Sequence, residues 1–290
     1  MGVIGVGRMG LPICARLAAA GWAVSATDLR PEREADVRAA GAGWTPDTAG
    51  LVDGADVVLT VLPGQAEVEA VMAVAMARLR PEMTWIDMTS GDPRTARALV
   101  ADAAARGVEA LDAGLGGGVP AAEDGTLQLF VGGDAAAVDR HRSLLRCLGR
   151  VEHVGGPGGG RLVKLLVNLL WFGQSLAVSE AMLVARRSGL EPDVVAGALG
   201  RSAAASAFVA ADLPAVLAGD YRDSFELERC CAQIDALAGV ARELAVPFEL
   251  SETVRGAYRA ALERYGPVDG ELRPVALLEE RAGIALRDSA

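Results

Sequence analysis

Lysine is almost absent from this chain of 290 residues: Lys164 is the only one, against 27 arginines. Arginine matches lysine as a surface cation, but with a pKa above about 12 it cannot give up its proton in a protein. A desolvated lysine can be tuned to a pKa of roughly 7–8 and can then shuttle protons. Lys164 is therefore either a surface residue without a specific function, retained by chance, or a residue needed for acid–base chemistry.

Aromatic residues, basic clusters and long apolar runs are also scarce. Aromatic side chains make up 4% of the chain, so small aliphatic residues and glycine must fill a globular core. A net charge of −10 without a basic cluster argues against nucleic acid or an anionic membrane as a partner. No uninterrupted apolar run reaches the roughly 18–20 residues of a bilayer span. The N-terminus enters a strand at once, which is not typical of a signal peptide.

The four cysteines show neither the spacing of a metal site nor a disulfide framework. Cys230 and Cys231 are adjacent, and adjacent cysteines rarely form a bridge. We therefore expect a reduced, soluble, cytoplasmic protein without a bound metal.

A glycine-rich turn near the N-terminus predicts a dinucleotide-binding unit. Residues 2–6 form a short apolar strand that runs into Gly5-Val-Gly-Arg-Met-Gly10, and a helical pattern follows. A second strand then ends at Asp28. The G-x-G-x-x-G motif is weak by itself but strong between a strand and a helix. Its glycines allow a pyrophosphate to approach the helix N-terminus, although packing alone is the alternative reason for them.

Asp28 bears on which dinucleotide this unit binds. Its carboxylate would accept hydrogen bonds from both ribose hydroxyls and repel a 2′-phosphate, which favours NAD. Arg30 could instead pair with that phosphate, which leaves NADP open. The residues expected to contact the cofactor are Gly5, Gly7, Arg8, Met9, Gly10, Asp28, Leu29, Arg30, Leu62, Pro63, Thr89 and Ser90.

The alternation of strands and helices continues and predicts an α/β Rossmann domain. Further strands are expected at 55–62, 84–88, 108–112 and 127–132, with a short one near 153–154. Ligands of open α/β sheets bind beyond the carboxyl ends of the strands. The segments 62–63 and 89–90 and the residues from Asp112 onward should therefore line one crevice. The two histidines, His141 and His153, fall away from it and are interpreted as structural.

Three consecutive glycines, Gly116, Gly117 and Gly118, follow the strand expected to end at Asp112. They expose backbone amides without side-chain obstruction, which suits an anion such as a carboxylate. A flexible glycine-rich turn is the alternative.

A second glycine-dense stretch, residues 155–160, indicates a boundary between domains at 1–157 and 158–290. Residues 161–187 then predict one long, nearly apolar helix of about 40 Å, which usually forms the spine of a domain or a subunit interface. No further strand series follows, so the second domain should be all-α. Its later helices are expected at 193–199, 206–217, 227–244 and 250–265.

Lys164 falls in the first turn or so of the long helix. The positive end of the helix dipole opposes its charge there, which should lower the lysine's pKa. Asn168 follows at i+4 on the same face and could hold the amine or a substrate oxygen. This placement favours an acid–base role for Lys164 over a surface position without a specific function.

These segments together resemble the β-hydroxyacid dehydrogenase family, which includes 3-hydroxyisobutyrate dehydrogenases and tartronate semialdehyde reductases and is related to 6-phosphogluconate dehydrogenase. The resemblance covers nearly the whole chain. It is carried by Gly5-Val-Gly-Arg-Met-Gly10, Thr60-Val-Leu-Pro63, Asp87-Met-Thr-Ser90, residues 112–127, Gly160-Arg-Leu-Val-Lys164, Ser179-Glu-Ala181 and Gly189-Leu-Glu-Pro192.

The resemblance implies a doubly wound, mostly parallel sheet followed by an all-α domain built on a long inter-domain helix. It also implies hydride transfer between C4 of NAD(P) and a carbonyl or alcohol carbon of a small molecule, with Lys164 as the general acid/base. A homodimer or homotetramer is implied as well.

Three segments depart from the family pattern. The family has Asp-x-Pro-Val-Ser-Gly-Gly where this chain has Asp112-Ala-Gly-Leu-Gly-Gly-Gly118, so Gly116 stands in place of a substrate-binding serine. The asparagine three residues after the lysine is Val167, with Asn168 one residue later, and a downstream Lys-Asp pair becomes Ala232-Gln233. Losing a hydroxyl and a cation favours a bulkier or less anionic carbonyl compound as the substrate.

Two other functions fit parts of this pattern. Imine reductases share the architecture but typically carry aspartate or tyrosine where Lys164 stands. A non-catalytic dinucleotide-binding protein, such as a redox sensor, is favoured by the missing functional groups at 116 and 232, whereas the lysine and the acidic composition argue against it.

Overall fold

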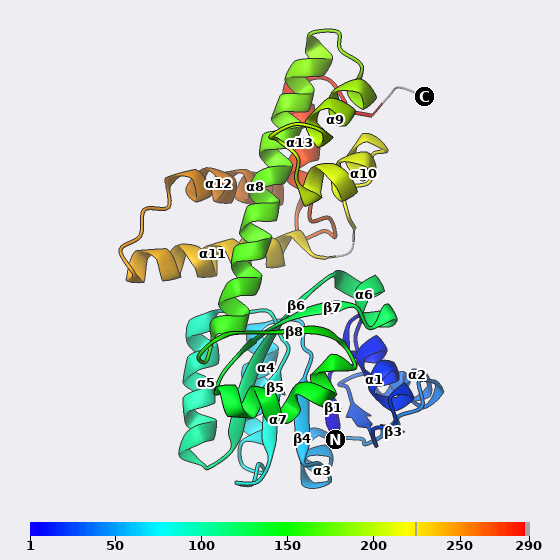
Figure 1. The fold of residues 1–290 in the computed structure, drawn as a ribbon, viewed down its shortest axis with the longest axis vertical. Helices are drawn as coiled ribbons and strands as arrows, with labels where there is room; N and C mark the ends of the chain where they lie inside the picture. The colour runs from blue at the N-terminus through cyan, green and yellow to red at the C-terminus, as the bar shows by residue number, and fades with distance from the viewer. Residues whose placement is uncertain (224, 288–290) are drawn as a thin grey trace. The chain divides into compact units, whose positions relative to one another are not determined.

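The computed structural model describes residues 1–223 and 225–287, whose contacts divide the chain into two units, Met1–Leu165 and Leu166–Ala290. The first unit holds one eight-stranded sheet with helices on both faces (Figure 1). Its strands are β1 (Gly2–Ile4), β2 (Ser25–Thr27), β3 (Gly43–Trp44), β4 (Val57–Thr60), β5 (Thr84–Asp87), β6 (Glu109–Gly116), β7 (Leu127–Gly132) and β8 (Gly149–Gly155).

The sheet has the order β3-β2-β1-β4-β5-β6-β7-β8, and only the pair β6–β7 is antiparallel. The order reverses beside β1, so the carboxyl ends of β1 and β4 lie at the topological switch point where open sheets bind ligands. The predicted doubly wound, mostly parallel sheet is confirmed.

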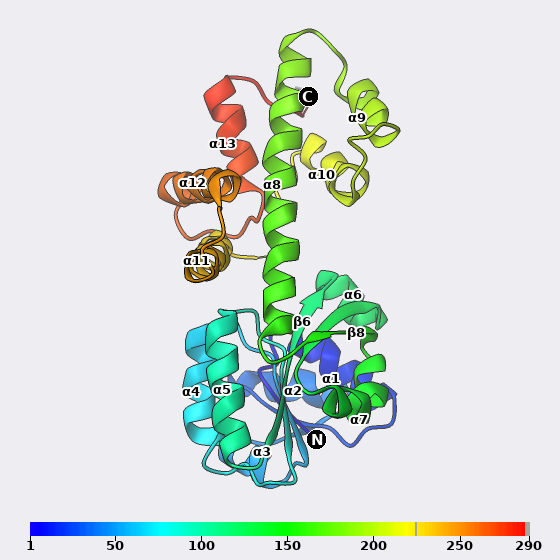
Figure 2. The same ribbon diagram turned by 60° about the vertical axis from the view of Figure 1, so that its left-hand side comes forward.

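Two apolar cores hold the helices against the sheet. Figure 2 shows α4 and α5 on one side and α1 and α7 on the other. One core contains Ile13 and Leu17 of α1, and the other contains Met72 of α4 and Val100 of α5. The helices of this unit are α1 (Gly10–Ala19), η1 (Pro31–Arg33), α2 (Glu34–Ala39), α3 (Thr48–Asp53), α4 (Gln65–Ala75), α5 (Pro93–Ala105), α6 (Gly118–Asp124) and α7 (Ala135–Arg146).

Strand β6 is longer than predicted. It does not end at Asp112 but continues to Gly116, paired in antiparallel register from Asp112↔Gly132 to Gly116↔Gln128. The expected turn begins only at Gly117 (φ +106°) and Gly118 (φ +67°). Gly114 before it is required by close packing, since a Cβ there would lie 2.5 Å from the carbonyl oxygen of Gly160. The strand predicted to end at Asp112 is therefore four residues longer than expected, and the turn is confined to Gly117 and Gly118.

The second unit is helical, as predicted, and has its own core around Met182, Phe208, Leu213 and Val275. Helix α8 crosses the boundary between the units. Helix α13 lies outside the predicted set, and the segment expected at 206–217 is a π-helical turn followed by α10. The helices are α8 (Gly159–Arg187), α9 (Pro192–Gly200), η2 (Phe208–Asp212), α10 (Leu213–Leu217), α11 (Leu227–Glu243), α12 (Glu249–Tyr265) and α13 (Arg273–Ala282).

Within the described residues, α8 is the one helix long and apolar enough to cross a membrane by length and composition, with a mean hydropathy of 1.5. The search for an uninterrupted apolar run did not identify α8, because charged residues such as Lys164 interrupt its apolar sequence. The spine helix of a globular domain passes the same test, and the first turn of α8 packs against the sheet of the first unit.

Candidate functional site

The three glycines of the N-terminal motif have different surroundings. A Cβ at Gly5 would lie 2.4 Å from the carbonyl oxygen of Val61, and one at Gly10 would lie 1.9 Å from that of Gly5. At Gly7 the nearest heavy atom would be Nη2 of Arg30, 3.9 Å away. Packing therefore accounts for Gly5 and Gly10 but not for Gly7, whose open backbone fits the close approach of a pyrophosphate.

Arg8 is exposed and Met9 partly exposed in the same turn, while Leu29 is fully in solvent at the end of β2. The motif and the end of β2 meet at Asp28, whose Oδ2 accepts a hydrogen bond from the N–H of Val6 at 2.9 Å.

Asp28 is already engaged by Arg30. Its Oδ1 accepts hydrogen bonds from the backbone N–H and from Nε of Arg30, both at 3.0 Å. Partial burial raises the pKa of Asp28, but these bonds and the N–H of Val6 outweigh it, so the net pKa is lowered. A ribose hydroxyl must therefore share this ionised carboxylate with a guanidinium that is itself exposed.

The ends of β4 and β5 are tied together by side chains. Oγ1 of Thr60 donates to Asp87 at 2.7 Å, and the N–H of Leu62 donates to Oγ1 of Thr89 at 3.0 Å. The segments Leu62–Pro63 and Thr89–Ser90 are thereby brought together at one edge of the sheet, beside the end of β1. This is the arrangement expected of two loops lining one crevice.

Asp112 fixes the start of α8. Its Oδ1 accepts the N–H of Gly158 at 2.6 Å and its Oδ2 accepts the N–H of Arg161 at 2.8 Å. Burial raises the pKa of this carboxyl, whereas the two N–H donors and the charge of Arg161 oppose the rise. The helix lies so close that a Cβ at Gly160 would stand 2.2 Å from the carbonyl oxygen of Phe130.

Lys164 is thereby held over β6. A Cβ at Gly114 would lie 2.7 Å from the Cβ of Lys164, so the lysine side chain starts directly above this glycine and is partly buried. Gly116, two residues further along the strand, is buried, whereas Gly117 and Gly118 are exposed.

Asn168 lies one turn after Lys164 on α8 and has a protein partner. Its Nδ2 donates to Oε1 of Gln233 on α11 at 2.7 Å, and Gln233 is buried. The sequence pattern singled out both positions but did not predict that they contact each other.

Arg161 was missed at the sequence level. It is 1% exposed and forms a buried ion pair with Asp87. Its spacing of three residues from Lys164, which places both on one helix face, was the available signal.

His141 lies at the amino ends of β5 and β6, opposite this edge of the sheet, and His153 lies on the outer strand β8. His141 contacts Thr84 at 2.9 Å and Glu109 at 3.0 Å, and these are the first residues of β5 and β6. His153 contacts the carbonyl oxygens of Gly133 and Gly155, both at 3.0 Å.

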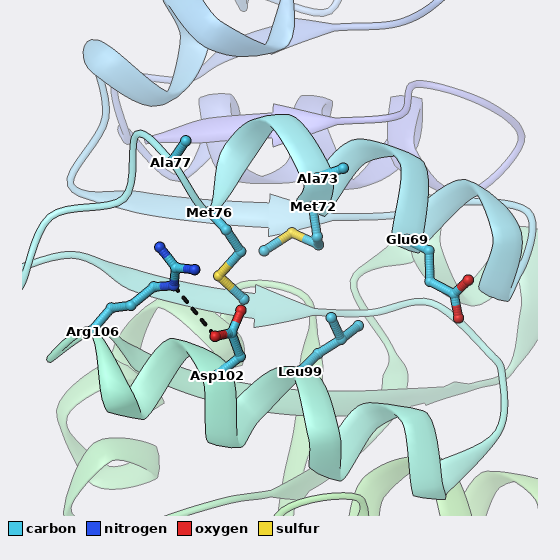
Figure 3. A pocket seen from close by; sticks show the side chains of 8 residues that line it. All are labelled: Glu69, Met72, Ala73, Met76, Ala77, Leu99, Asp102 and Arg106. Atoms are coloured by element: carbon cyan, nitrogen blue, oxygen red, sulfur yellow. Dashed lines mark hydrogen bonds and ion pairs between the residues drawn. The ribbon is translucent and has the colours of Figure 1, made fainter.

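The cavity in Figure 3 is not this site. It has a volume of 330 Å³, lies between α4 and α5, and includes an ion pair of Arg106 with Asp102 at 3.4 Å. None of the residues predicted to bind cofactor or substrate lines it. Its lining residues are Glu69, Met72, Ala73, Met76, Ala77, Leu99, Asp102 and Arg106.

The glycine surroundings give a matched pair of substitutions. Gly10→Ala is expected to destabilise the fold by about 1–3 kcal/mol, because its Cβ meets backbone. Gly7→Ala should leave the melting temperature nearly unchanged and weaken NADH binding at least about tenfold, or 1.4 kcal/mol. Thermal unfolding and NADH fluorescence titration measure both effects. Unchanged NADH affinity in Gly7→Ala would contradict the inference that the pyrophosphate approaches the backbone at Gly7.

Family models match both halves of the chain. Residues 1–156 match the NAD binding domain of 6-phosphogluconate dehydrogenase, and residues 158–278 match the NAD-binding domain of NADP-dependent 3-hydroxyisobutyrate dehydrogenase. The NAD-dependent L-serine dehydrogenase of Pseudomonas aeruginosa is 34% identical over 203 residues, which cover 69% of this chain and 68% of that protein.

Solved structures share the fold. The 3-hydroxyisobutyrate dehydrogenase of Mycobacterium tuberculosis, solved with L-serine, has a TM-score of 0.87 at 24% identity and covers 95% of this chain and 98% of its own. An imine reductase from Myxococcus stipitatus has a TM-score of 0.66 at 19% identity, covering 96% and 98%. The family models and the relative above 30% identity favour the dehydrogenases over the imine reductases. The chain belongs to the β-hydroxyacid dehydrogenase family and is an NAD(P)-dependent oxidoreductase that acts on CH–OH groups or the corresponding carbonyls.

Proposed function

We propose that Lys164 is the general acid/base of this oxidoreductase. The observation that carries the proposal is the placement of the only lysine, in the first turns of a helix that Asp112 fixes at the carboxyl edge of the sheet. NAD(P), when bound, accepts or supplies the hydride at C4 of its nicotinamide. Lys164 takes the hydroxyl proton when an alcohol is oxidised and returns it to the developing alkoxide on reduction.

The glycine segment after β6 supplies the substrate's anchoring groups. Gly117 and Gly118 are exposed and carry no side chain, so their amides hold a substrate oxygen. Gly116 stands where the family has a substrate-binding serine, so this position offers the substrate additional space but no hydroxyl group. Asn168, held by Gln233, orients the substrate or the amine of Lys164 from one turn further along α8.

The substrate is a hydroxy compound that is bulkier or less anionic than the small acids typical of the family. The relatives act on L-serine and on 3-hydroxyisobutyrate, both small carboxylates, by their names. Gly116 and the pair Ala232-Gln233 remove a hydroxyl and a cation that would hold such a carboxylate. NAD is the preferred dinucleotide because Asp28 is ionised, and the exposed Arg30 beside it permits NADP.

The remaining organisation follows from the same features. Residues 1–157 form the cofactor domain, and residues 158–290 form the domain for substrate and subunit contacts. The protein works as a homodimer or homotetramer in the cytoplasm. Apolar side chains on α8 support a subunit interface, since they are 42–67% exposed: Leu166, Val167, Leu170 and Val184.

Lys164→Arg tests the acid–base role directly. The arginine keeps the charge but cannot exchange the proton, so turnover should fall about 10²–10⁴-fold. Melting temperature and NADH affinity should stay as in the wild type. Oxidation of L-serine, 3-hydroxyisobutyrate and larger hydroxy acids, followed as NADH or NADPH formation, gives the rate. Turnover equal to the wild type would refute the role.

Gly116→Ser tests the altered pocket. A Cβ there would lie 3.3 Å from both Cβ and Oε1 of Gln128, so a side chain fits once Gln128 shifts by a few tenths of an ångström. The new hydroxyl should raise kcat/KM for 3-hydroxyisobutyrate about 10- to 100-fold, the worth of one hydrogen bond to a charged group. Gly116→Ala serves as the control for added volume. An equal gain in both variants, or none in either, would argue against the missing hydroxyl as the cause.

Light scattering of the purified protein tests the assembly. A mass of two or four times 29.8 kDa is expected, and Leu170→Glu on the exposed apolar face of α8 should reduce it. A monomeric wild type would contradict the interface on α8.

A further inference from the structure

One buried guanidinium joins three segments of the first unit. Nη2 of Arg161 pairs with the carboxylate of Asp87, and both side chains are at most 2% exposed. Nη1 donates to Oε1 of Gln65 at 2.7 Å and to the carbonyl oxygen of Asp92 at 3.3 Å. The guanidinium therefore contacts the first residue of α4 and the residue that caps α5.

These partners belong to the two loops assigned to the cofactor. Asp87 also accepts hydrogen bonds from Oγ1 of Thr60 at 2.7 Å and from the N–H of Thr89 at 3.1 Å. Thr89 in turn accepts the N–H of Leu62 at 3.0 Å. A continuous chain of hydrogen bonds thus runs from the loop after β4, through the loop after β5, to the first turn of α8.

Arg161 and Lys164 are three residues apart on α8 and so share one face of the helix. Asp112 holds the backbone N–H groups at the helix start, and the side chain of Arg161 adds a second connection, from the same turn to the loops after β4 and β5. A shift of Arg161 would therefore carry Lys164 with it.

Stability alone does not account for this arrangement. A buried ion pair is weak evidence for stability, because desolvating two charges offsets most of their attraction and apolar replacements often match it. What the pair supplies is geometry, since a guanidinium fork fixes the angle between its partners.

We propose that Arg161 is a positioning residue that sets Lys164 relative to the two cofactor loops. The inference rests on the acid–base role proposed for Lys164. Arg161 acts through the helix and through Asp87, without touching the reacting atoms.

The test removes the charges together. The double variant Arg161→Leu/Asp87→Asn removes both charges of the ion pair, so neither member is left without the other, and the amide oxygen of asparagine can still accept from Thr60 and Thr89. Gln65→Met is a milder second variant that removes one partner and no charge. Asp102→Asn, which breaks the exposed pair with Arg106, is the matched control. Arg161→Lys keeps the positive charge but lacks the planar guanidinium with its fixed donors, and it shows how much activity the charge alone restores.

Five quantities are measured: the melting temperature, the NADH affinity, kcat and KM for 3-hydroxyisobutyrate or L-serine with NAD, and the NMR signal of Lys164. Because Lys164 is the only lysine, ¹³C-lysine labelling gives one side-chain signal in every variant except Arg161→Lys, which is used for kinetics alone. That signal needs no known substrate.

The double variant should lose about 10- to 100-fold in kcat, the scale of a misplacement near 1 Å, with KM and NADH affinity changed less than threefold. The Lys164 signal should shift, Gln65→Met should show smaller changes of the same sign, and Arg161→Lys should recover part of kcat. An unchanged signal and kcat, with only the melting temperature lowered, would overturn the inference. Wild-type turnover in Lys164→Arg would instead refute the proposed function, whatever Arg161 does.

Discussion

The carboxylate of Asp112 is the constraint on which the position of Lys164 depends. This carboxylate is fully buried, and the free-energy cost of removing it from water is offset by hydrogen bonds from the N–H groups of Gly158 and Arg161. These two N–H groups are donors at the start of α8. Glycines let the helix and the strands come this close, since a Cβ at Gly132 would lie 2.5 Å from Oδ1 of Asp112. The helix therefore begins at a defined place on the sheet, and this start determines the position of Lys164.

Glycine serves two purposes in this chain, and the structure separates them. Gly5, Gly10 and Gly114 lie where a side chain would meet neighbouring atoms, so they are required by packing. At Gly7 and Gly118 the nearest heavy atom to an added Cβ would be 3.9 Å away, so packing against neighbours does not require glycine there. The same residue type therefore shapes the scaffold and the binding surface, and one substitution at each kind of position has a different consequence.

Local patterns allowed much of the fold to be predicted, and long-range contacts explain the rest. The strand–glycine–helix motif, the strand at 127–132 and the long helix depend on short periodic segments, which a single sequence shows. The extension of β6 depends on pairing with β7, a partner that local glycine content does not reveal. Arg161 pairs with Asp87, 74 residues away in the sequence. Its spacing from Lys164 indicates the shared helix face but not this distant partner. Asn168 was recognised by its spacing and Gln233 as a departure from the family pattern, but the hydrogen bond between them was not predicted.

The central claim is that Lys164 exchanges the proton of the reaction. The most direct test is the pH titration of its single NMR signal with NADH bound, compared with the pH dependence of kcat/KM. The account predicts that Lys164 titrates well below the ordinary lysine range and that the kinetic profile follows the same ionisation. A Lys164 that remains protonated throughout the pH range of activity would contradict it.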